Sequence, residues 1–213
     1  MNEKKYPSLT VVIPVFNEEK TIEYVLRSVS DSSLVNEIVI VNDFSTDKSL
    51  GIIDKTIELI LKDKTSLKIQ LFNSDKNKGK GASLRKGFEL ANSEVIVIQD
   101  ADLEYDPFDY YKLLVPFFET NADIVYGSRF LGGGKYVRIH FFWHYLANKI
   151  LTFLCNLSIN LNLTDMETGY KVFKTSSLKS IYLKEKSFAF EPEVLSLIHI
   201  SEPTRLRRIS YAV

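Results

Sequence analysis

The chain has 213 residues, of which 45% are apolar, and this is enough to bury one sizeable hydrophobic core. Its 27 basic and 27 acidic side chains cancel, so no overall field attracts nucleic acid or an anionic membrane. Cys155 is the single cysteine, which excludes an intramolecular disulfide and a cysteine-based zinc cluster and fits a reducing compartment. Residues 1–8 are polar and lack the apolar stretch of a secretion signal, so we expect a cytosolic protein.

Short apolar runs bounded by turn residues predict strands, and helical patterns fall between them. The expected strands are residues 9–15, 37–41, 67–72, 95–98 and 124–126, and the expected helices are residues 20–30, 48–61, 80–91 and 107–118. Ser45, Thr46 or Asp47 would cap the second helix. Because the strands are nearly continuous Val and Ile and alternate with helices, the sequence predicts an α/β fold with a mostly parallel sheet covered on both faces.

Residues 139–163 show a different pattern, rich in Phe and Leu but with a polar residue at every fourth position. On a helix these polar positions form a narrow stripe on an otherwise broadly apolar surface: His140, His144, Asn148, Thr152 and Asn156. Lys149 adds a charge, so the segment is a poor candidate for a membrane span. Two interpretations stay open, a helix lying in a membrane interface and a helix buried against the main domain or a second subunit.

Two carboxylates, Asp100 and Asp102, directly follow the fourth expected strand. Strand ends of this kind are where α/β proteins bind ligands, and a bend in the chain can direct both carboxylates toward one divalent cation. Oxygen ligands suit Mg²⁺ or Mn²⁺ shared with a diphosphate, so the pair indicates metal-assisted chemistry on a nucleotide. The alternative is a solvated turn, because Asp is common where strands end.

Polar loops also follow the first three expected strands. Pro14 stiffens the exit from the first strand, ahead of a helix N-terminus. Asp43 could accept hydrogen bonds from a nucleobase or ribose, although helix capping also explains the residues around it. Gly79 and Gly81 allow close backbone approach and Lys80 offers charge to phosphate; a flexible basic turn is the alternative. The usual glycine-rich dinucleotide and ATP loops do not occur in the sequence, so nucleotide binding must use another geometry.

Five motifs in order resemble those of family 2 glycosyltransferases: residues 12–19, 41–47, 77–82, 99–107 and 127–130. Residues 143–146 and 163–173 narrow the resemblance to the branch of dolichyl-phosphate mannose and glucose synthases, with bacterial members that act on polyprenyl phosphate. The resemblance covers roughly residues 8–194. It implies a GT-A fold, which is a Rossmann-like α/β nucleotide-binding sheet, and inversion of the anomeric centre without a covalent intermediate.

The resemblance also implies roles for individual residues. Asp100 and Asp102 would hold Mg²⁺ or Mn²⁺ against the donor diphosphate. The nucleoside site would be lined by Pro14, Asn17, Glu18 and Asp43. Phosphate contacts would come from Lys80 and Arg129, and Asp165 would face the acceptor. The catalytic residues would be Asp102, Arg129 and Asp165. The family's second loop often reads Asp-Asp-Gly where this chain has Asn42, Asp43 and Phe44, which leaves the choice of base open.

The resemblance implies transfer of a sugar from a UDP- or GDP-sugar to a polyprenyl phosphate, with no role for nucleic acid. A phosphate acceptor needs no strong general base, because its second pKa lies near 6. The alternative acceptor is a saccharide hydroxyl in surface-polysaccharide synthesis, whose proton Asp165 would remove. A nucleotide-sugar-binding protein without turnover is a third hypothesis. A polyprenyl acceptor favours the interfacial interpretation of residues 139–163, with peripheral contact at the inner face of the membrane.

The end of the chain breaks the family pattern abruptly. Residues 195–205 resemble a conceptual translation of a transposon-type sequencing adapter, residues 209–213 resemble its distal arm, and residues 206–208 lie where a sample index would be. We therefore expect a nucleotide-sugar-binding core at residues 1–135, an amphipathic helix and truncated acceptor-side segment of the same domain at residues 136–194, and a non-native tail at residues 195–213. The alternative is a genuine basic C-terminal segment.

Overall fold

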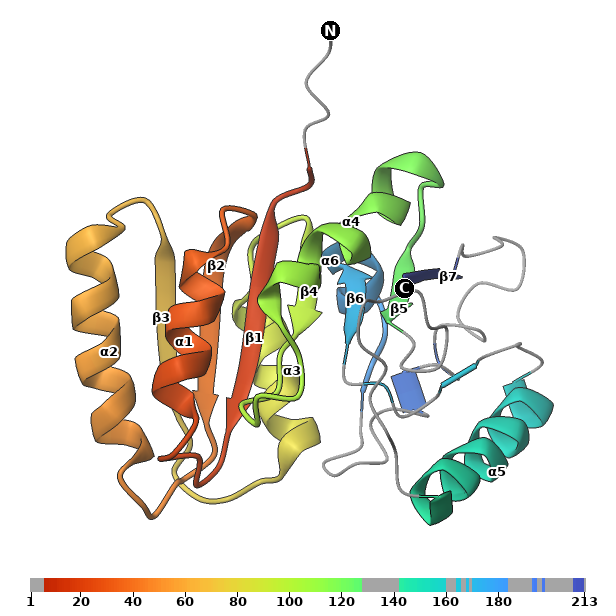
Figure 1. The fold of residues 1–213 in the computed structure, drawn as a ribbon, viewed down its shortest axis with the longest axis horizontal. Helices are drawn as coiled ribbons and strands as arrows, with labels where there is room; N and C mark the ends of the chain where they lie inside the picture. The colour runs from red at the N-terminus through yellow and green to blue at the C-terminus, as the bar shows by residue number, and fades with distance from the viewer. Residues whose placement is uncertain are drawn as a thin grey trace, which may run out of the picture.

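The computed structural model describes residues 6–127, 142–159, 164–165, 168, 170–183, 193–194, 197 and 209–212. Strands and helices alternate along most of this length (Figure 1). The strands are β1 (Leu9–Val15), β2 (Val35–Asn42), β3 (Lys68–Asn73), β4 (Val95–Ile98), β5 (Ile124–Gly127), β6 (Lys171–Lys174) and β7 (Ile209–Ala212). The helices are α1 (Ile22–Asp31), α2 (Ser49–Asp63), α3 (Lys80–Leu90), α4 (Tyr110–Glu119) after the 3₁₀ turn η1 (Pro107–Asp109), α5 (Phe142–Ile159) and α6 (Thr175–Lys179). The five strands and four helices expected before residue 127 are confirmed. Their ends lie within two residues of those predicted, except that α4 begins three residues later, because residues 107–109 form the turn η1.

The strands form one seven-stranded sheet in the order β3-β2-β1-β4-β6-β5-β7. The pairs β1–β2, β2–β3, β1–β4 and β5–β7 are parallel, and β6 runs antiparallel to its neighbours β4 and β5. The mostly parallel α/β sheet predicted from the sequence is therefore confirmed. The sequence analysis did not predict β6, because only two apolar residues, Val172 and Phe173, lie between its flanking lysines.

The edge strand β7 lies beside β5 and comes from the segment expected to be a non-native tail. An edge strand joins a sheet through its backbone groups, so pairing there requires an extended chain more than particular side chains. The pairing of β7 is compatible with either origin of residues 195–213. The expected boundaries of the three parts therefore stay predictions.

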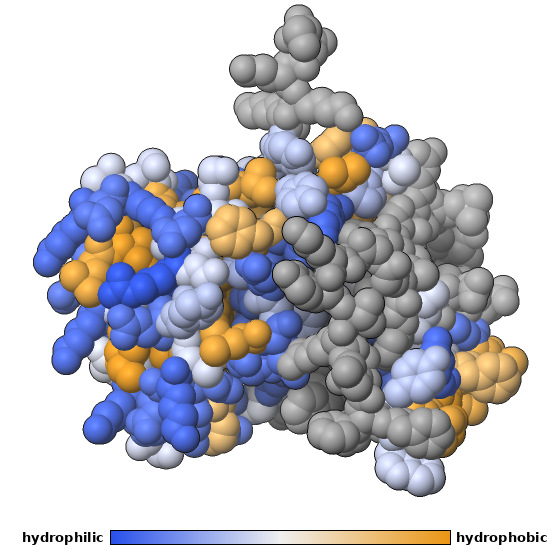
Figure 2. Space-filling view, in the orientation of Figure 1, coloured by the Kyte–Doolittle hydropathy of each residue, from blue (hydrophilic) through white to orange (hydrophobic). Residues whose placement is uncertain are grey.

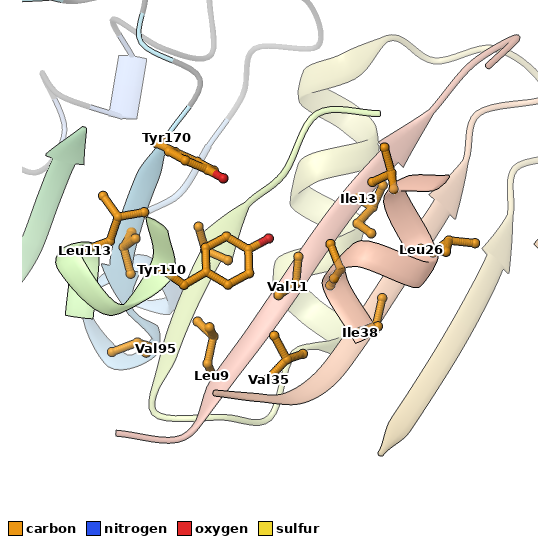
Figure 3. Close-up of a cluster of buried hydrophobic side chains, with 14 of the residues drawn as sticks. Leu9, Val11, Ile13, Leu26, Val35, Ile38, Val95, Tyr110, Leu113 and Tyr170 are labelled. Carbon is orange, nitrogen blue, oxygen red and sulfur yellow. The ribbon is translucent and has the colours of Figure 1, made fainter. Parts of the chain in front are cut away.

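Helices cover both faces of the sheet and bury a separate cluster of apolar side chains on each face. On one face α1, α2 and α4 pack over Leu9, Val11 and Ile13 of β1. Figure 3 shows these three residues with Leu26 of α1 and Tyr110 of α4. On the other face α3 and α6 pack, together with Val12 of β1. This alternation is the period of two expected for a strand covered on both sides. Gly87 lets α3 lie close to β1, since a β-carbon there would be 2.3 Å from Cγ1 of Val12.

Two residues of the polar stripe of α5, Asn148 and Thr152, face inward, and much of the described apolar surface of the helix faces outward. Asn148 and Thr152 are buried, whereas Trp143, Phe153 and Leu157 are 74%, 66% and 73% exposed. Part of this apolar surface is visible at the lower right of Figure 2. Burial of the apolar surface against the main domain, one interpretation of the sequence, is therefore wrong for these side chains. None of the described helices is long and apolar enough to cross a membrane.

A buried carboxylate connects β1, β2 and β3. Glu37 of β2 is 2% exposed and accepts hydrogen bonds from Thr10 of β1, Gln70 of β3 and the N–H of Asn92 at 2.6, 2.9 and 2.8 Å. Burial by itself would raise the pKa of Glu37, but these hydrogen bonds outweigh it and keep the pKa below its ordinary value of 4.5. The folded protein therefore favours the ionised form of Glu37.

We predict that Glu37→Gln destabilises the protein at neutral pH by about 1–3 kcal/mol. The carboxylate of Glu37 accepts hydrogen bonds with both oxygens, whereas the NH₂ group of glutamine is itself a donor and would face other donors. Because folding lowers the pKa of Glu37, the ionised carboxylate stabilises the folded protein above about pH 4.5. This stabilisation is lost as the pH falls through the pKa that Glu37 has in the folded protein. The difference in unfolding free energy between the two proteins, measured by urea denaturation, should therefore shrink below about pH 4.5. A difference that stays constant into more acidic solution would contradict this role of Glu37.

Candidate active site

Three loops meet at the carboxyl ends of the central parallel strands. The chain passes from β1 to β2 and β3 on one side and then returns to place β4 on the other side of β1. Such a reversal leaves a crevice at the carboxyl edge, where α/β proteins bind ligands. The loops are residues 16–21, 43–48 and 99–106. Pro14 also lies at this edge. The pairing of β1 with β4 ends at Val12, so the missing N–H of Pro14 costs no hydrogen bond to β4.

The loops after β1 and β2 are hydrogen-bonded to each other. The N–H of Asn17 donates to Oγ of Ser45 at 3.0 Å, and the side-chain oxygen of Asn17 accepts from the N–H of Thr46 at 2.8 Å. The N–H of Glu18 donates to Oγ of Ser49 at 2.8 Å. Asn17 has a left-handed backbone with φ 58°, which asparagine tolerates better than most residues. Asn17 and Glu18, both predicted nucleoside contacts, thus lie in two mutually braced loops.

One of the three predicted caps of α2, Asp47, is hydrogen-bonded to both the loop after β1 and the start of the helix. Asp47 accepts from the N–H of Ser49, the first residue of α2, at 2.9 Å and from the N–H of Glu19 at 3.1 Å. The N–H of Lys48 in turn donates to a carboxylate oxygen of Glu19 at 3.1 Å. Asp47 therefore serves the helix start, although Lys48 is the residue directly before α2. Polar side chains after β2 act on the loop after β1 as well as on their own helix.

Asp43 holds the loop that leads into α3. Its side chain is almost fully buried, and its two carboxylate oxygens accept from the N–H groups of Lys78 and Gly79 at 2.9 and 2.7 Å. Gly79 has φ 87°, a conformation that favours glycine, and it directly precedes Lys80, the first residue of α3. Asp43 thereby fixes where Lys80 begins its helix. The sequence indicated Asp43 for the nucleoside but did not indicate these partners, which lie 35 and 36 residues further along the chain.

The carboxylates after β4 lie beside a cation from α3. Nζ of Lys80 is 2.7 Å from a carboxylate oxygen of Asp100, so a predicted phosphate contact and a predicted metal ligand are neighbours. Partial desolvation, with a contribution from the charge of Asp100, raises the pKa of Asp102, although Asp102 also accepts from the N–H of Glu104 at 3.0 Å. A cation relieves the repulsion between two such carboxylates. The pair therefore fits a divalent metal, which proteins often hold with one or two carboxylates and substrate phosphates.

Asp165 is fully buried and is hydrogen-bonded to a side chain of α5. Nδ2 of Asn148 donates to a carboxylate oxygen of Asp165 at 2.8 Å, and Oγ1 of Thr152 donates to the side-chain oxygen of Asn148 at 3.0 Å. The polar stripe of α5 thus attaches the helix to the residue that the resemblance assigns to the acceptor side. Contact between Asp165 and an acceptor stays a prediction. Arg129 lies outside the described residues.

Sequence analysis missed the roles of Gln99 and Asn148. Gln99 belongs to one of the five motifs, and it is a polar residue at the end of a wholly apolar strand with 1% exposure. Asn148 belongs to the polar stripe of residues 139–163, and the sequence pattern indicates no partner for it. In both cases the sequence contains a polar residue among apolar residues that are expected to be buried. Such a residue needs a hydrogen-bond partner, and this requirement could have indicated its role.

The fold is that of GT-A glycosyltransferases. Glucosyl-3-phosphoglycerate synthase from Mycobacterium tuberculosis, solved with Mn²⁺, uridine diphosphate and phosphoglyceric acid, matches this structure with a TM-score of 0.69. The match covers 96% of this chain and 68% of that one, at 19% sequence identity. This likeness confirms the GT-A fold expected from the sequence.

The family model for glycosyl transferase family 2 matches residues 10–182, and the chain belongs to this family. A dolichol-phosphate mannosyltransferase of Pyrococcus furiosus is 26% identical over 191 residues, which are 88% of this chain and 52% of the relative. A dolichyl-phosphate beta-glucosyltransferase of Trichomonas vaginalis is 27% identical over 212 residues, with 91% and 62% coverage. The predicted likeness to the dolichyl-phosphate sugar synthase branch is confirmed. The chain spans between half and two thirds of the length of these two relatives.

Phe44, directly after Asp43, has a strained backbone. Its φ is 60°, and its side chain is 49% exposed, so burial of the ring offsets little of the strain. A left-handed backbone costs roughly 1–2 kcal/mol for a residue that carries a β-carbon. Strain of this kind concentrates at binding sites, and Phe44 lies in one of the three loops of the crevice.

We predict that Phe44→Gly stabilises the protein by about 0.5–1 kcal/mol, because relief of strain exceeds the added flexibility of glycine in the unfolded chain. Phe16→Gly is the matched control, since Phe16 is 47% exposed in the neighbouring loop without a positive φ. The control should lose stability, because only the entropic effect of glycine applies to it. Thermal unfolding of the three proteins measures both changes, and a loss of stability in Phe44→Gly would rule out strain at this position.

Proposed function

We propose that this protein transfers a sugar from a UDP- or GDP-sugar to a polyprenyl phosphate, with inversion at the anomeric carbon. The observation that carries the proposal is the meeting of Asp100, Asp102 and Lys80 at the carboxyl edge of the sheet, where a nucleoside diphosphate needs positive charge. Membership of family 2 supports sugar transfer. Similarity to two dolichyl-phosphate sugar transferases supports a polyprenyl phosphate acceptor.

On the donor side, Asp100 and Asp102 would hold Mg²⁺ or Mn²⁺. When bound, the metal would neutralise the charge that grows on the departing nucleoside diphosphate. Lys80, now paired with Asp100, would add a second positive charge at the diphosphate. The Mn²⁺ and uridine diphosphate in the mycobacterial structure support this use of the crevice. The nucleoside site would be lined by residues at the ends of β1 and β2: Pro14, Asn17, Glu18 and Asp43.

On the acceptor side, a phosphate oxygen would attack the anomeric carbon while the bond from that carbon to the donor's β-phosphate oxygen breaks. The electron pair of that bond leaves with the nucleoside diphosphate. The acceptor phosphate is largely ionised near neutral pH, so no side chain has to remove a proton. Arg129 would contact the donor or acceptor phosphate. Asp165, bonded to Asn148, would belong to the acceptor side of the site.

The outward surface of α5 supports peripheral binding at the cytoplasmic face of a membrane, where a polyprenyl acceptor would be found. The apolar face of α5 consists of residues three or four positions apart, all of them at least 37% exposed: Trp143, Leu146, Ile150, Phe153 and Leu157. A helix with this pattern lies in the interface, with Trp at headgroup level. The buried Asn148 on its other side would then connect the membrane-facing helix to Asp165.

Titration calorimetry with UDP-glucose and with GDP-mannose, each with Mn²⁺, measures donor binding, and transfer of radiolabelled sugar to polyprenyl phosphate measures turnover. Replacing both Asp100 and Asp102 with Ala should lower the Mn²⁺-dependent donor affinity by about tenfold or more and abolish transfer, because the metal would lose its protein ligands. Asp54→Ala, at an exposed position of α2, is the matched control and should change neither.

Retention of metal-dependent affinity and transfer in the double variant would refute the proposed function. Donor binding without transfer by the unmutated chain would favour a nucleotide-sugar-binding protein without turnover.

We predict that the protein floats with lipid vesicles in a density gradient and that Phe153→Asp with Leu157→Asp abolishes flotation, because two charges would enter the apolar face of α5. Tyr24→Asp is the matched control, since Tyr24 is 66% exposed on α1 and lies outside that face. Equal flotation of the double variant and the control would exclude α5 as the membrane contact.

A further inference from the structure

The loop that carries Asp100 and Asp102 is fastened from inside the protein by one buried amide. Gln99 is the first residue of the loop, and its N–H donates to the carbonyl oxygen of Val12 in β1 at 3.0 Å. Its side-chain Nε2 donates to the carbonyl oxygens of Asp100 and Tyr105 at 3.1 and 3.3 Å. One NH₂ group thus holds both ends of residues 100–105 and connects them to the central sheet.

Tyr110 determines which way this amide points. Its hydroxyl donates to Oε1 of Gln99 at 2.8 Å, and the whole side chain is buried at the start of α4. Because the amide oxygen accepts from this hydroxyl, the NH₂ group is left to face the loop. A hydrogen bond shielded from water is stronger than an exposed one, so the orientation of the amide is well defined.

The loop needs this support, because its backbone is not relaxed. Leu103, next to Asp102, has φ 62° and is 49% exposed. A left-handed backbone is unfavourable for a residue with a large side chain, and it persists only where surrounding contacts enforce it. The contacts of Gln99 lie on both sides of Leu103 in the chain and supply such enforcement.

We propose that Gln99 and Tyr110 are positioning residues that set the spacing of Asp100 and Asp102 for a divalent metal. The inference rests on the proposed function, which assigns a metal to these two carboxylates. Gln99 and Tyr110 act through the loop backbone: Tyr110 orients the amide, the amide fixes both ends of the loop, and the loop presents the carboxylates. Residues behind metal ligands tune metal affinity in this way, because affinity depends on ligand geometry.

Tyr170 provides a matched control within the same group of rings. Its ring centroid lies 5.9 Å from that of Tyr110 and 4.5 Å from that of Tyr105. Figure 3 shows the neighbouring rings of Tyr170 and Tyr110. Tyr170 is 6% exposed, and its hydroxyl has no hydrogen-bond partner among the described residues. Tyr170→Phe therefore removes a buried hydroxyl from a ring that neighbours Tyr110, and it leaves the described hydrogen bonds of the Gln99 amide unchanged.

The experiment titrates Mn²⁺ into each 213-residue protein in the presence of UDP or GDP, whichever the unmutated protein binds, and titrates the same nucleotide without metal. Tyr110→Phe should weaken Mn²⁺ binding by about fivefold to tenfold, the effect of one lost hydrogen bond, and change metal-free nucleotide binding by less than about twofold. Tyr170→Phe should change both by less than about twofold. Gln99→Glu keeps an acceptor for Tyr110 but lacks the NH₂ group, so it should weaken Mn²⁺ binding at least as much.

Mn²⁺ binding by Tyr110→Phe that equals that of Tyr170→Phe would overturn the positioning role while leaving the proposed function intact. A parallel loss of metal-free nucleotide binding and of thermal stability in Tyr110→Phe would also overturn it, because Tyr110 would then only maintain the fold. If the unmutated protein binds no Mn²⁺ with either nucleotide, the proposed function fails and the inference fails with it.

Discussion

The candidate site depends on one constraint, the parallel pairing of β2, β1 and β4. Parallel neighbours point their carboxyl ends to the same edge of the sheet, so the three loops that follow these strands must converge there. The strands can be so short and apolar because helices bury both of their faces. Polar residues are therefore displaced to the strand ends, and this is where the carboxylates, the asparagine and the lysine of the crevice collect.

Convergence alone would leave mobile loops, and polar side chains at the strand ends hold them in place. Asn17 and Ser45 join the first two loops, and Asp43 holds the two amides that precede Lys80. Gln99 spans the loop that carries both acidic residues. In each case a polar side chain pairs with backbone groups, so the loops are ordered without a ligand. A site arranged in advance loses less entropy when a substrate binds.

The helix α5 reverses the usual arrangement of an amphipathic helix on a globular protein. A buried polar residue needs a partner, and Asn148 finds one in the carboxylate of Asp165, which is itself fully buried. The hydrogen-bonded stripe therefore faces the protein, and the apolar face of α5 is left outside. For a protein that would take an acceptor from a lipid layer, this orientation puts the apolar contact and the acceptor-side carboxylate on opposite sides of one helix.

The amino-acid sequence by itself determined the strands and helices before residue 127 and the class of protein. Runs such as residues 95–98 and the periodicity of residues 80–91 are local patterns, and the ordered motifs were enough to indicate the family. Tertiary structure alone decided the place of β6 between β4 and β5, the inward direction of the α5 stripe, and the partners of Asp43, Gln99 and Asp165. The physical reason is that a polar side chain pairs with whatever group the fold brings within about 3 Å. For Asp43 and Gly79 that group lies 36 residues away, where no local pattern of the chain reports it.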